Sequence, residues 1–214
     1  SRQPLAPLQA LYRTAPQIRQ TPALGPLLSY ELERWQQRLS HASTDATQVV
    51  DQLLYVAAAA ALLGEEIVAL RCLERIDQVP KAWARVVAHP EQRAQLATTL
   101  VHTEPDALTT LLLTGAIRRF DDAGAQLLYT ITTQLQPLIA DQRATPTQVQ
   151  LMTQCVDTVR HAAIVNLPSR RIAAVILGQA GAVDEVVSQI TTIQHVLSAQ
   201  RATGYSSSKD DANL

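Results

Sequence analysis

Five histidines are the side chains best suited to acid–base or metal chemistry, and their spacing decides whether either is expected. They are His41, His89, His102, His161 and His195. None of them lies at metal-ligand spacing from a cysteine or from a second histidine. Asp157 and His161 are four residues apart on a predicted helix, where an ion pair is favoured over a pair of metal ligands. We therefore expect no metal site.

Three pairs of adjacent acids have the right chemistry for general acid–base catalysis, but their positions favour a structural role. The pairs are Glu65–Glu66, Asp121–Asp122 and Asp184–Glu185. Neighbouring helical side chains point about 100° apart, so the two carboxylates of a pair do not share a face. Each pair begins an apolar run, where acids stabilise a helix start. Phosphate-loop, HExxH and G-x-S-x-G motifs are absent, and we expect neither an enzyme nor a cofactor.

The cysteines and the arginine doublets are weaker candidates. Cys72 and Cys155 lie far apart and outside any CxxC spacing, which favours buried free thiols over a disulfide. Arg118–Arg119 and Arg170–Arg171 could contact phosphate, although a solvated helix face is favoured for both. The net charge of −1 provides no general attraction for nucleic acid.

Apolar residues recur at intervals of three and four along most of the chain, which predicts an all-α fold. Strand alternation and hairpin turns are absent. Short connections between the predicted helices make neighbouring helices antiparallel. Helices are expected over 26–39, 43–63, 65–79, around 83–87, 90–101, 106–120, 121–135 (with a break at Pro137), 147–165 (opened by Thr145 and Pro146), 170–180 (capped by Ser169) and 182–199. Trp35 and Trp83 are expected in the core or at an interface.

The two ends of the chain are expected to differ from this helical body. We predict a proline-rich arm over residues 1–25, one all-helical domain over 26–200 and a polar C-terminal tail over 201–214. The first 30 residues hold five of the eleven prolines and no acid, and proline blocks helix interiors. An acid-poor, arginine-bearing start resembles organellar targeting sequence, and a start without methionine is typical of a processed protein.

The arm is the predicted partner-binding segment. Its apolar residues are expected to contact a partner protein, and its arginines to meet acidic groups on that partner. These residues are Leu5, Leu8, Leu11 and Tyr12 for the apolar contacts, and Arg2, Arg13 and Arg19 for the charged ones. The low share of charged residues, 17% against roughly 25% in ordinary domains, also indicates a surface that a partner covers.

A tight turn between two apolar runs recurs at Gly64, Phe120 and Gly181. Adjacent acids follow each turn, and glycine at two of them permits the left-handed conformation that ends a helix. The segments "LLGEEIVALRCLERI", "RRFDDAGAQLL" and "AAVILGQAGAVDEVVSQI" resemble the inter-helix turn of pentatricopeptide repeats and, more loosely, of tetratricopeptide repeats. This resemblance implies antiparallel helical hairpins stacked as an irregular α-solenoid. An irregular all-α bundle is the alternative.

The resemblance also implies a class of function. A non-catalytic accessory subunit of a large assembly is favoured, located in the mitochondrial matrix or otherwise in the cytoplasm. Pentatricopeptide-like subunits of this kind occur in mitochondrial ribosomes and in the ATP synthase of some protists. The partners would be other protein subunits, with no nucleic acid and no transmembrane segment. Two alternatives remain: an organellar protein that binds single-stranded RNA, and a soluble adaptor that binds peptides.

Overall fold

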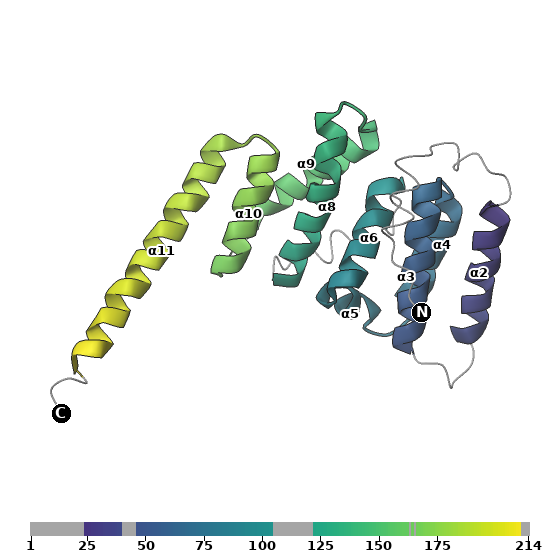
Figure 1. Cartoon of the computed structure of the whole chain (residues 1–214), viewed down its shortest axis with the longest axis horizontal. Helices are drawn as coiled ribbons and strands as arrows, with labels where there is room; N and C mark the ends of the chain where they lie inside the picture. The colour runs from purple at the N-terminus through teal and green to yellow at the C-terminus, as the bar shows by residue number, and fades with distance from the viewer. Residues whose placement is uncertain (1–23, 40–45, 105–121, 163, 165, 211–214) are drawn as a thin grey trace.

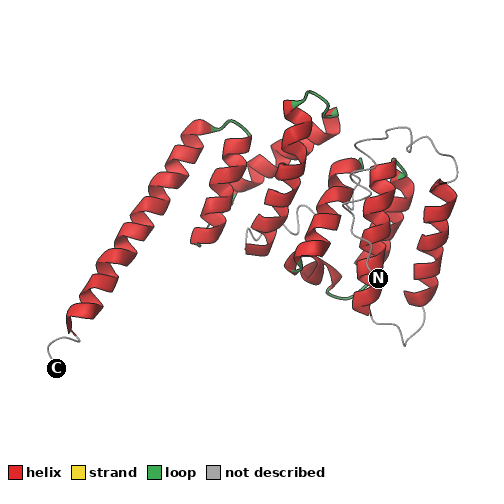
Figure 2. Cartoon of the chain, in the orientation of Figure 1, coloured by secondary structure: helices red, strands yellow, loops and turns green. Residues whose placement is uncertain are grey.

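The secondary structure is helical throughout the part of the chain that the structure describes (Figure 2). The computed structural model describes residues 24–39, 46–104, 122–162, 164 and 166–210. Nine helices and no strand lie within these residues, so the all-α class is confirmed. The helices are α2 (Leu24–Leu39), α3 (Ala46–Leu63), α4 (Glu66–Asp77), α5 (Ala82–Ala88), α6 (Pro90–His102), α8 (Asp122–Ala140), α9 (Pro146–His161), α10 (Leu167–Gln179) and α11 (Val183–Asp210).

Four helices form a continuous row through the molecule (Figure 1). α3 contacts α6, α6 contacts α8, and α8 contacts α10. α4, α9 and α11 each follow one helix of the row along the chain and pack against it. One core cluster runs through the row and includes Leu53, Leu73, Leu128 and Ile176. Trp83 packs against this cluster, and its indole N–H donates to Asp77 Oδ1 at 2.7 Å.

α3 is the central apolar helix of this core. Its alanine run, Ala57 to Ala61, is buried, and short side chains allow neighbouring helices to approach closely. By length and composition α3 could span a membrane, and 61% of it is buried inside the protein. A buried core helix meets the same criterion, so the observation does not by itself indicate a membrane.

α3 and α10 end in the same hydrogen-bonded turn. After α3, Glu65 N–H donates to Ala60 O at 2.8 Å and Gly64 N–H to Ala61 O at 3.2 Å. After α10, the same two bonds run from residues 182 and 181 to residues 177 and 178. This is the Schellman motif, which needs one residue in the left-handed conformation. Gly64, with φ +81°, and Gly181, with φ +75°, occupy that position.

α8 ends in the same motif with glutamine in the left-handed position. Arg143 N–H donates to Leu138 O at 2.8 Å, and Gln142 N–H donates to Ile139 O at 3.0 Å. Gln142 has φ +55°. The sequence offers no glycine at this point, so the motif was not predicted there. The predicted turn at Phe120 lies outside the described residues.

The helices of the row end at nearly regular intervals. α3, α6, α8 and α10 end at residues 63, 102, 140 and 179, which are 39, 38 and 39 residues apart. The acid pairs of the sequence do not reveal this interval, because the pair after Phe120 begins α8 rather than following its end. The structure therefore contains a period that the acid pairs had obscured.

Several predicted helix boundaries were wrong, for identifiable reasons. Pro137 does not break α8, because it lies in the last turn and removes only one donor there. The cap of α10 is Asn166 rather than Ser169: Asn166 Oδ1 accepts from Ser169 N–H at 2.7 Å, and Pro168 fits the first turn. α11 continues to Asp210, eleven residues beyond the predicted end at 199, because extending a helix needs no new nucleus.

Candidate functional site

α11 carries an apolar stripe that the described part of the protein leaves uncovered. Val183, Val187 and Ile190 are exposed over 67%, 56% and 44% of their surface. Their spacing of four and three residues places them on one face of the helix. Nine large apolar side chains are exposed among the described residues, and no other helix contributes more than two. Single exposed apolar residues are normal, whereas a contiguous set indicates a binding surface. We call Val183, Val187 and Ile190 the α11 stripe.

α11 also outruns the helix that supports it. α10 has 13 residues and α11 has 28, which correspond to lengths of about 20 Å and 42 Å. Figure 1 shows α11 extending well past α10, at the end of the molecule opposite α2. A helix gains most of its stability in a protein from packing of its apolar face. The distal part of α11 lacks that support within the described residues.

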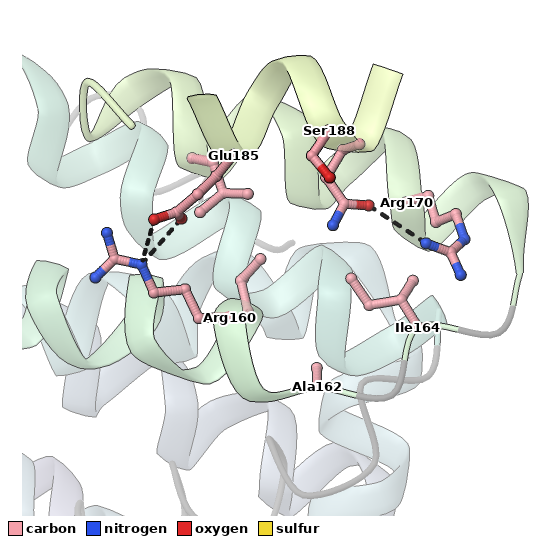
Figure 3. A pocket seen from close by; sticks show the side chains of 9 residues that line it. Arg160, Ala162, Ile164, Arg170, Glu185 and Ser188 are labelled. Atoms are coloured by element: carbon pink, nitrogen blue, oxygen red, sulfur yellow. Dashed lines mark hydrogen bonds and ion pairs between the residues drawn. The ribbon is translucent and has the colours of Figure 1, made fainter. Parts of the chain in front are cut away.

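The face of α11 opposite the stripe is fastened to α9 by an ion pair. Arg160 Nε donates to both carboxylate oxygens of Glu185, at 2.9 Å and 3.1 Å (Figure 3). Arg160 Nη1 also donates to Asp157 Oδ1 at 3.1 Å. Hydrogen bonds to Glu185 and then to Asp157 raise the pKa of the Arg160 guanidinium. At about 100° per residue, Glu185 and the α11 stripe point in roughly opposite directions.

This ion pair corrects one sequence prediction. An ion pair was expected between Asp157 and His161, but the Asp157 carboxylate binds Arg160 instead. His161 Nδ1 lies 2.7 Å from the backbone carbonyl of Asp157. Asp184 and Glu185 lie in the first turn of α11, where the macrodipole favours acids. Glu185 therefore has a second contact, to α9, that its position in the sequence does not reveal.

The described residues bring together no arrangement typical of catalysis. No group of three or more His, Cys, Asp or Glu side chains within them is placed to hold a metal ion. Cys72 and Cys155 are buried free thiols, and burial raises the pKa of each to about 12. A protonated thiol is a poor nucleophile, so neither cysteine has the environment of a reactive one.

Most of the predicted partner-binding residues lie outside the described part of the chain. This applies to the whole set in the arm, Arg2, Leu5, Leu8, Leu11, Tyr12, Arg13 and Arg19, and to the doublet Arg118–Arg119. Arg170 and Arg171 are described and separate: Arg170 is partly buried and Arg171 is exposed. The α11 stripe was missed, because periodicity identifies an apolar face but not whether another helix covers it. Its signal is nevertheless present in "VDEVVSQI".

Comparison with known proteins adds no assignment: no family model matches the chain, and neither a curated protein nor a solved structure matches it.

Proposed function

We propose that this protein is a non-catalytic accessory subunit that binds another protein through the α11 stripe. The observation that carries the proposal is the exposure of Val183, Val187 and Ile190 on one face of the last helix. A stacked helical array needs a polar outer face on its terminal unit to remain soluble alone. The terminal helix here has an apolar outer face instead, as expected for an array whose end is covered by a partner.

The occupant that suits this surface is an amphipathic helix of the partner. Apolar residues spaced by four and three form a ridge that packs between the ridges of a facing helix. The part of α11 beyond α10 would lengthen the same interface. A mitochondrial assembly remains the proposed location, on the acid-poor start of the chain, and the ATP synthase of protists is one example of such an assembly. The N-terminal arm is a second proposed contact.

We further propose that the fold is an irregular α-solenoid of antiparallel hairpins. The row α3–α6–α8–α10 and the intervals of 39, 38 and 39 residues support this proposal. In it, α3 pairs with α4, α8 with α9 and α10 with α11, while the segment 105–121 would complete the hairpin of α6. The shared Schellman turn after α3, α8 and α10 falls between the two helices of each hairpin.

A photo-crosslinking experiment tests the proposed interface. A benzophenone amino acid at position 187, introduced in cells of the source organism, should crosslink to one protein with a yield that saturates. The same group at Glu74, which is exposed on α4, is the control and should give no comparable product. Equal yields at the two positions, or no product at 187, would exclude the α11 stripe as the interface.

A further inference from the structure

A pocket of about 320 Å³ lies where the end of α9 and the chain that follows it meet α10 and α11 (Figure 3). This volume is at the lower end of the range for small-molecule sites. Its apolar wall includes Val159, Ile164 and Leu177, all buried. Its polar wall includes Arg160, Arg170 and Ser188. The pocket is on the side of α11 away from the α11 stripe, so it does not depend on the proposed interface.

The two arginines of the pocket differ in what they already bind. Arg160 is held by Glu185 and Asp157. Arg170 donates from Nη1 to Gln189 Oε1 at 3.5 Å, a long contact with a neutral group. Within the described residues Arg170 forms no ion pair with a carboxylate. A guanidinium carries five N–H donors, so most of the hydrogen-bonding capacity of Arg170 is directed at the pocket or at solvent.

The position of Arg170 is unusual within the repeated structure. Eleven residues before the left-handed residues Gly64, Gln142 and Gly181 lie Leu53, Ile131 and Arg170. Leu53 and Ile131 are completely buried core residues. Arg170 also lies near the start of α10, where the helix macrodipole disfavours a cation. An arginine at this point lowers the stability of the helix and gives the pocket a positive charge where the corresponding helices have an apolar side chain.

We propose that this pocket binds a carboxylate carried on a small branched apolar group. The carboxylate accepts a pair of hydrogen bonds from the Arg170 guanidinium, whose planar geometry matches its two oxygens. The Ser188 side chain faces the same space and adds a hydroxyl donor (Figure 3). The branched apolar group packs on Val159, Ile164 and Leu177. Such a ligand exists both as a free small acid and as an acidic residue beside leucine in a peptide.

Titration of the ¹⁵N-labelled full chain with three probes tests the proposal by nuclear magnetic resonance. N-acetyl-leucine presents the free acid, its amide N-acetyl-leucinamide is the uncharged control, and a capped peptide with internal glutamate beside leucine presents the other source. We expect saturable shifts of the Arg170 side-chain signal and of the Ser188 amide with at least one carboxylate probe at millimolar concentration or below. The probe that binds more tightly identifies the source.

A matched pair of variants locates the site. Arg170→Gln should weaken binding of the carboxylate probe about tenfold or more, because a charge-assisted pair of hydrogen bonds is lost. Arg171→Gln removes the same charge from the neighbouring exposed position and should change binding less than about twofold. Three results would overturn the proposal: no saturable shift with either carboxylate probe, equal binding of the amide, or equal loss in both variants. The first two use the wild-type protein and do not depend on a variant folding.

Discussion

Gly178 and Gly181 lie three residues apart and have opposite backbone requirements. Gly181 has φ +75°, and a Cβ there would meet no atom within 4 Å, so the penalty for a side chain comes from the backbone alone. Gly178 is helical, and a Cβ there would lie in ordinary contact with Val186 Cγ2 at 3.8 Å. Gly181→Ala should lower the free energy of unfolding by about 1 kcal/mol, whereas Gly178→Ala should raise it by about 0.5 kcal/mol. Urea denaturation measures both values, and shifts of the same sign would contradict the assigned turn.

The two buried thiols make a separate prediction. Because burial raises the pKa of Cys72 and Cys155 to about 12, both stay protonated in the folded protein at pH 8. Ellman's reagent should therefore react with neither thiol in the native protein and with both after unfolding in denaturant. The folded state keeps these protons while the unfolded state loses them from about pH 9. The stability that the thiols contribute is present below pH 9 and is lost as the pH rises toward 12. Rapid reaction of a native thiol at pH 8 would show that the site is accessible.

At the scale of the helices, the end of α8 is the most informative element. Gln142 holds the left-handed conformation that glycine holds after α3 and α10, at a cost that glycine avoids. Gln142→Gly should therefore raise the free energy of unfolding by about 0.5 kcal/mol, after allowance for the greater freedom of glycine in the unfolded chain. The same substitution at Gln136, exposed inside α8, should lower it by about 1 kcal/mol. Thermal denaturation of the two variants compares them directly, and destabilisation by Gln142→Gly would contradict a strained position.

The same elements show how far the sequence can predict this structure. Apolar periodicity predicted the helices, and glycine predicted the turn residues Gly64 and Gly181, because both signals are local. Gln142 could not be predicted, since glutamine has no local preference for positive φ and the surrounding hydrogen bonds impose it. The pairing of Glu185 with Arg160 joins residues 25 positions apart, and no local pattern contains it. Arg170 and Arg171 look alike in sequence, and only packing separates the partly buried arginine from the exposed one.

At the scale of the whole molecule, one end of the helical row is closed and the other is open. α2 covers α3 and α4 at the N-terminal end, whereas α11 presents the α11 stripe at the other. The pocket beside Arg170 lies on the opposite side of the same helix, so α11 separates two surfaces of different chemistry. The proposed partner and the proposed carboxylate can therefore be removed independently, by Val187 or Ile190 substitutions in one case and by Arg170 substitutions in the other.

The central claim is that the α11 stripe holds this chain in a larger assembly, and the mass of the native particle tests it most directly. The variant Val187→Asp with Ile190→Asp places two charges on the stripe, and burying them without partners should weaken association about 100-fold or more. His195→Asp, on another exposed face of α11, is the matched control. In sedimentation of extracts from the source organism, the wild type and the control should travel with the assembly, and the stripe variant should sediment as the folded 23.3 kDa chain. If the stripe variant stays in the assembly at full occupancy, or if the wild type itself sediments as a single chain, the account is wrong.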